Sequence, residues 1–258
     1  MSETMNDYAG LFRLDGKRAA LIGAGGIGRE AALALAAHGA KVTCLDKDPA
    51  TARATAAEAG GEAQDLDVTD AAAVEQAAAG LGEVDILVLT AATNVRKRIL
   101  DYTPAEFDRV VNLNLKATFT VLQAFGRRMV RRGQGSIVVF SSVRGYVVEP
   151  GQAVYAATKA GAIQLVKTAA AEFGEQGVRV NAIAPGVVET PLTNQIKANP
   201  EWYDAYATKG ALGRWAKPAE LAGAVVYLAS DAATYVTGTT LMVDGGWTAV
   251  DGRYTPPT

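Results

Sequence analysis

Short apolar runs alternate with helical patterns along most of this 258-residue chain. The runs that predict buried strands lie at residues 18–23, 41–46, 63–68, 84–90, 136–140, 178–183 and 239–244. Alanine-rich or amphipathic stretches predict a helix that ends near residue 37 and further helices at 71–80, 104–129, 152–174 and 218–229. This alternation predicts the α/β class, with one doubly wound parallel sheet and helices on both of its faces.

One segment departs from the alternation. Residues 191–217 are polar and irregular, with four large aromatic side chains at Trp202, Tyr203, Tyr206 and Trp215. Long irregular loops often close over active sites, so we expect this segment to be a mobile substrate lid. Because no linker, low-complexity segment or compelling repeat divides the chain, residues 1–258 are expected to form a single domain, with tails at 1–11 and 250–258.

Composition narrows the class of protein. Hydrophobic residues make up 49% of the chain and charged residues 20%, which is enough apolar sequence for a sizeable core. The net charge of −2 suggests no nucleic-acid partner. One cysteine and one histidine are too few for a protein-built zinc site, so no metal is expected. The polar N-terminus is unlike a signal peptide and no apolar run approaches membrane-spanning length, so we expect a cytoplasmic protein with no membrane contact.

A glycine turn follows the first predicted strand. It contains Gly23-x-Gly25-x-x-Gly28 and opens a helix, and Asp46 ends the next strand eighteen residues after Gly28. In this context the glycines let the backbone approach a diphosphate, and the helix N-terminus supplies N–H groups and a partial positive charge. Asp46 could accept hydrogen bonds from both ribose hydroxyls of an adenosine. The alternative is a tight turn followed by a solvated acid.

A second motif carries candidate chemistry. Tyr155 and Lys159 are four positions apart and share a helix face, and Ser142 lies thirteen positions before the tyrosine. A nearby ammonium lowers the pKa of a phenol, and a hydroxyl could hold a substrate oxygen beside it. The motif predicts proton transfer to or from an alcohol or carbonyl, provided that a hydride carrier binds nearby. The alternatives are an amphipathic helix face for the pair and a helix cap or turn for Ser142.

With these pieces placed, residues 12–250 resemble the classical short-chain dehydrogenase/reductase family, which has a Rossmann-like fold. The resemblance rests on both motifs and on Asp67-Val68, Asn114-Leu115-Lys116, Pro185-Gly186-x-x-x-Thr190 and Asp244-Gly245-Gly246. It implies that Asn114, Ser142, Tyr155 and Lys159 are the catalytic residues. Tyr155 would pass the proton, Lys159 would bind the nicotinamide ribose, and Asn114 would support a water chain to solvent. Without the resemblance, Asn114 would be interpreted as a helix residue that contacts neighbouring backbone.

The resemblance also implies a nicotinamide cofactor and its contacts. Asp67 and Val68 would touch the adenine, and Val188 and Thr190 would hold the carboxamide end; Val188 could equally be core, and Thr190 could cap a turn. The acid at position 46 favours NAD over NADP, although Lys47 could partly offset this preference. The full implied set is Gly23, Gly26, Ile27, Gly28, Asp46, Asp67, Val68, Ala91, Tyr155, Lys159, Pro185, Gly186, Val188 and Thr190.

The family further implies a homotetramer in which the long helices at 104–129 and 152–174 pair between subunits. The apolar residues at helical spacing in the first of these could line that interface or belong to the internal core; they are Phe107, Val110, Val111, Leu115, Phe119 and Leu122.

Two departures from the family pattern concern cofactor binding. Only Ala24 and Gly25 separate Gly23 from Gly26, so the glycine loop is one residue short. The family's Asn-Asn-Ala-Gly after the fourth strand is here Leu89-Thr90-Ala91-Ala92, so the hydrogen bonds usually made there must be replaced or absent.

The predicted function is hydride transfer between NAD and a secondary alcohol or ketone, with a small sugar, sugar acid or polyol as substrate. Segments 94–100 and 141–145 resemble those of gluconate- and polyol-type members. Reduction of a 3-oxoacyl thioester is an alternative, and a non-catalytic NAD-binding sensor or scaffold is another of a different class. Besides a small-molecule substrate, no partner other than copies of the chain is expected.

The candidate substrate residues are Ser142, Arg144, Gln152, Tyr155, Arg96 and Trp202. Arg96 and Arg144 lie in loops expected to flank Ser142, and guanidinium groups bind carboxylates, so a sugar acid is one candidate. The alternatives are that Arg96 belongs to a solvated run, that Arg144 pairs with a neighbouring acid, and that Gln152 is a surface loop residue.

Overall fold

The computed structural model describes residues 7–250, so parts of both predicted tails, residues 1–6 and 251–258, lie outside the described residues. Seven parallel strands form one sheet in the order β3-β2-β1-β4-β5-β6-β7. The strands are β1 Arg18–Ile22, β2 Lys41–Asp46, β3 Glu62–Asp65, β4 Ile86–Leu89, β5 Gly135–Phe140, β6 Val178–Pro185 and β7 Thr240–Val243. Each matches one predicted strand, and the doubly wound parallel sheet is confirmed.

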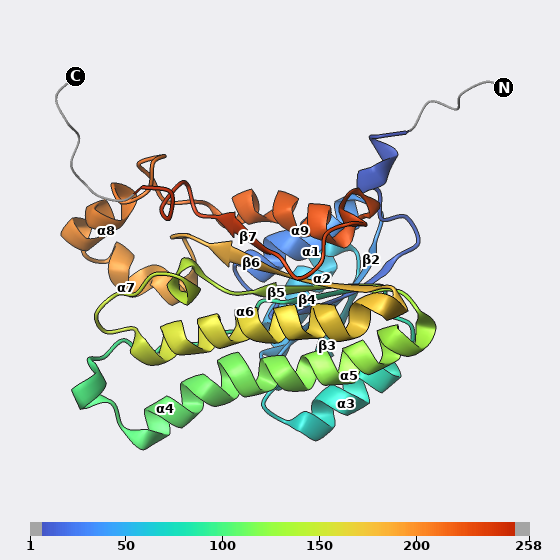
Figure 1. Ribbon diagram of the computed structural model, residues 1–258, viewed down its shortest axis with the longest axis horizontal. Coiled ribbons are helices and arrows are strands. Elements are labelled where there is room, and N and C mark those ends of the chain that lie inside the picture. Colours follow the sequence, from blue (N-terminus) through green and yellow to red (C-terminus); the bar gives the residue numbers. More distant parts are fainter. Residues whose placement is uncertain (1–6, 251–258) are drawn as a thin grey trace.

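Helices cover both faces of the sheet (Figure 1). One layer holds α1 Ile27–Ala37, α2 Pro49–Ala59 and α9 Ala222–Ala229, and the other holds α3 Ala71–Gly80, α4 Pro104–Val111, α5 Ala117–Arg132 and α6 Ala153–Phe173. Alternate residues of β1 enter the two cores, because successive strand side chains point to opposite faces. Ala20 and Ile22 pack toward α3, α5 and α6, whereas Ala19 and Leu21 pack toward α1, α2 and α9.

Helix α2 lacks a counterpart among the predicted helices. Its sequence is rich in Ala and Thr and has little amphipathic contrast, which hides the period. Its ends are nevertheless well specified. The Asp48 side chain accepts hydrogen bonds from the first backbone N–H groups, Pro49 takes the first helical position, and Gly60 ends the helix at φ 64°.

The predicted helix at 104–129 is divided by a π-helical turn, Asn112–Lys116, between α4 and α5. A capping box of Thr103 and Glu106 begins α4, and Gly133 at φ 77° ends α5. Such π turns insert one residue into the helical ladder and frequently occur at functional sites. Here the turn carries Asn114 and buries it.

Residues 191–217 are irregular only in part, mainly at 208–217, so the prediction of an irregular segment is wrong for its first half. They contain a short 3-10 turn, Pro191–Thr193, followed by α7 Asn194–Lys197 and α8 Pro200–Ala207, at one end of the sheet (Figure 1). Helices of four and eight residues are too short to produce a clear periodic signal. The aromatic side chains form their own core instead, in which Tyr203 stacks on Trp215 with ring centroids 4.8 Å apart. Within residues 7–250, no helix has the length and apolar character needed to cross a membrane.

Candidate active site

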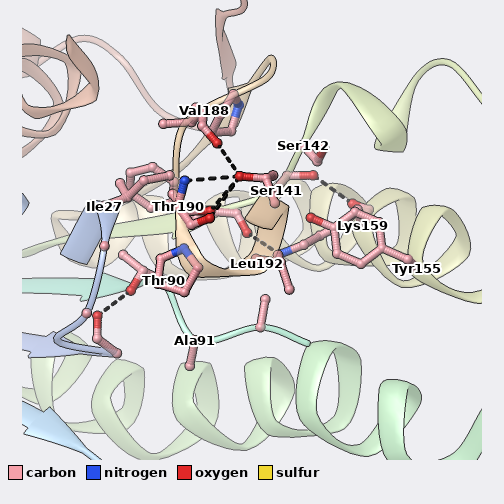
Figure 2. A pocket seen from close by; sticks show the side chains of 18 of the residues that line it. Ile27, Thr90, Ala91, Ser141, Ser142, Tyr155, Lys159, Val188, Thr190 and Leu192 are labelled. Carbon is pink, nitrogen blue, oxygen red and sulfur yellow. Dashed lines mark hydrogen bonds between the residues drawn. The ribbon is translucent and has the colours of Figure 1, made fainter. Parts of the chain in front are cut away.

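A cleft of about 340 Å³ opens at the carboxyl ends of β1, β4, β5 and β6 (Figure 2). The strand order reverses between β1 and β4, and doubly wound sheets bind ligands at such a point. The cleft brings together most of the predicted residues, namely Gly23, Gly26, Ile27, Asp46, Ala91, Ser142, Tyr155, Lys159, Pro185, Gly186, Val188 and Thr190. The predicted residues that do not line it are Gly28, Asp67, Val68, Asn114, Arg96, Arg144, Gln152 and Trp202.

Two threonine side chains hold the glycine turn in place. Gly23 has φ 93° and Gly26 has φ 53°, which are left-handed conformations that favour glycine. A Cβ at Gly28 would overlap the Gly23 carbonyl oxygen, so Gly28 permits the tight turn without lining the cleft. The Thr90 hydroxyl donates to the Gly23 carbonyl at 2.6 Å, and the buried Thr55 hydroxyl donates to the Ala24 carbonyl at 2.9 Å.

Thr90 therefore supplies a hydrogen bond at the position where this sequence departs from the family's Asn-Asn-Ala-Gly (Figure 2). It stands where the family has asparagine, at the end of β4, and its hydroxyl bridges that strand to the carbonyl of the glycine turn. The sequence showed that a side chain was missing at this position, but it did not show that a threonine hydroxyl would supply the hydrogen bond.

Asp46 lies at the end of β2 and closes the turn from the other side. One carboxylate oxygen accepts the Ala24 N–H at 2.7 Å and the other accepts the Asp48 N–H at 2.9 Å. Each oxygen keeps one further acceptor site, because a carboxylate offers about four in total. Asp46 also lines the cleft, so it can both support the turn and accept hydrogen bonds from a ligand.

Asp67 and Val68, the residues expected to touch the adenine, lie outside the lining of the cleft. Lys47 Nζ approaches Asp67 Oδ2 to 2.7 Å, and this contact, with hydrogen bonds from Thr69, lowers the pKa of Asp67 to about 2. Val68 is buried in the core beneath the sheet.

Tyr155 and Lys159 lie on α6, facing the cleft beside Ser142 (Figure 2). Lys159 Nζ lies 5.6 Å from the centre of the Tyr155 ring and donates to the Phe140 carbonyl at 2.8 Å. Ser142 caps the short turn Val143–Gly145, with its hydroxyl oxygen accepting the Arg144 N–H at 3.1 Å. The cap and the position at the cleft are compatible, because a hydroxyl can accept one hydrogen bond and donate another.

Burial dominates the ionisation of these groups. It raises the pKa of Tyr155, while hydrogen bonding with Ser142 and the positive charges of Arg144 and Arg96 act in the opposite direction. Burial also lowers the pKa of Lys159 to about 8. The protein by itself therefore does not lower the pKa of Tyr155, although the motif predicts that it should. Removing Tyr155 and Lys159 from water disfavours the charged form of each.

Asn114 lies behind the cleft. Its side-chain oxygen accepts the Thr93 N–H at 2.8 Å, and its amide donates to the Thr93 carbonyl at 2.8 Å and to the Thr158 hydroxyl at 3.2 Å. The alternative interpretation, in which Asn114 contacts neighbouring backbone, fits these bonds only in part, because Thr93 is 21 positions away and the Thr158 partner is a side chain. They tie the segment after β4 to α6, which carries Tyr155.

Arg144 and Arg96 share one carboxylate. Arg144 Nη2 lies 2.6 Å from Glu149 Oε2, and Arg96 Nη1 lies 3.1 Å from Glu149 Oε1. The alternative that Arg144 pairs with a neighbouring acid is confirmed. The Arg96 side chain is only 15% exposed, so its alternative as part of a solvated run is wrong.

Gln152 is 3% exposed, so its alternative as a surface loop residue is also wrong. Trp202 lies under Arg96, with the guanidinium carbon 4.8 Å from its ring centre. Glu149 and Tyr206 join these side chains but were not among the candidate site residues. Nothing in the local sequence marks Glu149, and Tyr206 was noted only as an aromatic residue of the expected lid. Within residues 7–250, no group of three or more His, Cys, Asp or Glu could hold a metal ion.

Comparisons with known proteins identify the family. A family model described as enoyl-(acyl carrier protein) reductase matches residues 23–248. Galactitol 2-dehydrogenase (L-tagatose-forming) of Cereibacter sphaeroides is 41% identical over 251 residues, which cover 94% of this chain and 99% of that protein. The chain belongs to the short-chain dehydrogenase/reductase family. A 3-oxoacyl-(acyl-carrier-protein) reductase of Thermotoga maritima is 37% identical, over 91% of this chain and 98% of that protein.

A solved relative supports the same assignment. The crystal structure of a gluconate 5-dehydrogenase from Burkholderia cenocepacia J2315, in complex with NADP and tartrate, superposes with a TM-score of 0.90 at 34% identity. The match covers 93% of this chain and 98% of that chain. The family resemblance predicted from the motifs is confirmed, and with it the prediction of a nicotinamide-dependent oxidoreductase.

Proposed function

We propose that this protein oxidises a secondary alcohol of a small sugar, sugar acid or polyol to the ketone, and catalyses the reverse reaction, with NAD as its cofactor. The observation that carries the proposal is that Ser142, Tyr155 and Lys159 share one cleft with the glycine turn and Asp46. A proton-transfer group and a dinucleotide-binding turn are thereby adjacent. The similarity to dehydrogenases of galactitol and gluconate supports the substrate class.

The residues of the cleft fit a dinucleotide. Glycines at 23 and 28 leave no room for a Cβ, which lets the turn approach a diphosphate, and the N-terminus of α1 supplies N–H groups. Asp46 would hold the adenosine ribose, and Thr190 and Val188 would hold the carboxamide end. When bound, the cofactor accepts or returns the hydride.

The protein's own residues would manage the proton. The Tyr155 phenol would exchange a proton with the substrate oxygen, and the Ser142 hydroxyl would hold that oxygen beside it. Lys159, anchored on the Phe140 carbonyl, would bind the nicotinamide ribose. The positive charge of protonated Lys159 would favour the phenolate form of Tyr155. Asn114 would hold the segment after β4 against α6 through its bonds to Thr93 and Thr158, and it would support a water chain.

The preference for NAD rests on charge at the end of β2. Asp46 would repel the additional phosphate of NADP and accept hydrogen bonds from the free hydroxyls of NAD. Lys47, the nearest candidate for binding that phosphate, is paired with Asp67 at 2.7 Å. We expect kcat/KM to be about tenfold or more higher with NAD. Equal or better kcat/KM with NADP would contradict the preference.

The experiment for the substrate class is a panel of alcohols and ketones followed at the reduced-nicotinamide absorbance band with both cofactors. We expect turnover of polyols or sugar acids. Reduction of 3-oxoacyl thioesters is the second candidate, since the Thermotoga maritima reductase is 37% identical. Activity confined to acyl thioesters would exclude the sugar proposal. Cofactor binding without turnover of any substrate would instead favour a sensor.

A further inference from the structure

A polar network centred on Glu149 lies beside the catalytic tyrosine. Its carboxylate binds Arg96 through one oxygen, at 3.1 Å, and Arg144 through the other, at 2.6 Å. The second oxygen also accepts hydrogen bonds from the Tyr206 hydroxyl and the Gln152 amide. The exposed fractions of the Arg144, Arg96 and Glu149 side chains are 8%, 15% and 19%, so solvent screens these charges only weakly.

The network adjoins the reacting position. The Arg144 N–H donates to the Ser142 hydroxyl oxygen at 3.1 Å, and the charges of Arg144 and Arg96 both act on Tyr155. Gln152 directly precedes α6, three residues before Tyr155. None of the side chains of the network lines the cleft itself, but they adjoin both groups that would hold a substrate alcohol, so we expect the neighbouring carbons of the substrate to extend toward them.

Glu149 already occupies the arginines that would otherwise attract a substrate carboxylate. Two guanidinium groups normally make a strong carboxylate site. A carboxylate held by the chain has a high effective concentration, so a substrate carboxylate would have to displace it or bind next to its negative charge. The arginine faces are covered as well, since Arg144 stacks 5.2 Å from the Trp247 ring centre and Arg96 stacks 4.8 Å from that of Trp202.

We propose that Glu149 determines substrate specificity by occupying both arginines with its own carboxylate, so that the site selects neutral polyols and ketoses over sugar acids. This inference rests on the proposed function and narrows its substrate class. Specificity of this kind depends on a repulsive element as much as on attractive ones. Here the Glu149 carboxylate would repel a substrate carboxylate, and Arg96 and Arg144 hold it in position.

Matched substrates test the proposal. Galactitol and galactonate share a carbon skeleton and differ in one terminal group, which is an alcohol in the first and a carboxylate in the second. We expect kcat/KM of the wild-type protein to be at least about tenfold higher for galactitol. In Glu149→Gln, which keeps the size and removes the charge, the KM for galactonate should fall about tenfold, while the value for galactitol should change less than about threefold.

The control variant is Glu75→Gln. Glu75 also contacts two arginines, Arg127 at 3.6 Å and Arg128 at 2.8 Å, but it lies on α3, away from the cleft. This variant should leave the galactitol-to-galactonate ratio unchanged. A wild-type preference for galactonate, or equal losses on both substrates in Glu149→Gln, would overturn the proposal.

A binding measurement separates this proposal from the proposed function. Threitol and tartrate have the same four carbons and differ in their end groups, and Trp202 and Trp247 beside the arginines report binding by fluorescence without turnover. With NADH present, wild-type protein should bind threitol more tightly than tartrate, and Glu149→Gln should bind tartrate about tenfold more tightly than wild type does. Tighter binding of tartrate by wild type would refute the role of Glu149 even if neither polyol is oxidised. If Glu149→Gln does not fold, Glu149→Ala, which also removes the charge, takes its place in both measurements.

Discussion

At the residue scale, Tyr155 carries the proton-transfer chemistry. Tyr155→Phe removes only the hydroxyl from a buried ring that packs on α6, so the fold and the cofactor site should persist. We expect turnover to fall by about a thousandfold or more, with NADH affinity nearly unchanged. Steady-state kinetics and a fluorescence titration with NADH measure the two quantities. If Tyr155→Phe keeps more than a small fraction of activity, the assignment of Tyr155 as proton donor is wrong.

Thr90 gives a second prediction at this scale. Valine has nearly the same shape but cannot donate the 2.6 Å hydrogen bond to the Gly23 carbonyl. A net hydrogen bond contributes roughly 0.5–1.5 kcal/mol, so Thr90→Val should raise the dissociation constant of NADH about two- to tenfold and leave kcat almost unchanged. Thr90→Ser keeps the hydroxyl and should restore affinity. Unchanged affinity in Thr90→Val would show that the short turn does not depend on Thr90.

At the element scale, α7 and α8 are the candidates for a lid. Tyr206 on α8 joins this segment to the Glu149 network, and Trp202 on the same helix covers Arg96. We propose that both helices open and close over the substrate. Backbone hydrogen exchange in residues 194–207 should be fast in the free protein and slow on addition of NADH and substrate. Slow exchange that ligands do not change would contradict a moving lid.

At the scale of the whole molecule, the outer face of α5 and α6 indicates assembly. Val110 and Leu122 are buried within the subunit, whereas Phe107 and Phe119 are 49% and 51% exposed, so the apolar residues of the long helix divide between core and surface. The exposed Phe119 and the partly buried Val130, Leu165 and Phe173 also line a groove between α5 and α6. Such surfaces commonly mark protein interfaces, and we propose a homotetramer that pairs through these helices.

Light scattering tests the assembly. The wild-type protein should show about four times the 26.8 kDa mass of one chain at micromolar concentration. Phe119→Glu places a charge on the exposed face and should lower the mass without unfolding the subunit, which circular dichroism checks. A monomeric mass for the wild-type protein would exclude the tetramer.

The sequence by itself determined the features that depend on neighbouring residues. Strands and the longer helices follow from hydrophobic period, and the glycine turn follows from backbone conformations that other residues adopt only at a cost. Tyr155 and Lys159 share a face because four residues make about one helical turn. For the same reason, the elements that escaped prediction were the short or weakly amphipathic ones, α2, α7 and α8.

Only the tertiary structure decided which distant side chains meet. Glu149 joins Arg96 from 53 positions earlier and Tyr206 from 57 positions later, and Thr90 reaches Gly23 across 67 positions. Whether an arginine faces a substrate or a buried acid depends on how loops after different strands converge at one edge of the sheet. The hydrophobic period of the sequence does not show this convergence, because each loop is positioned by the strand and helix that flank it. The sequence therefore predicted the family and the reacting residues, and packing decided the charge that the substrate encounters.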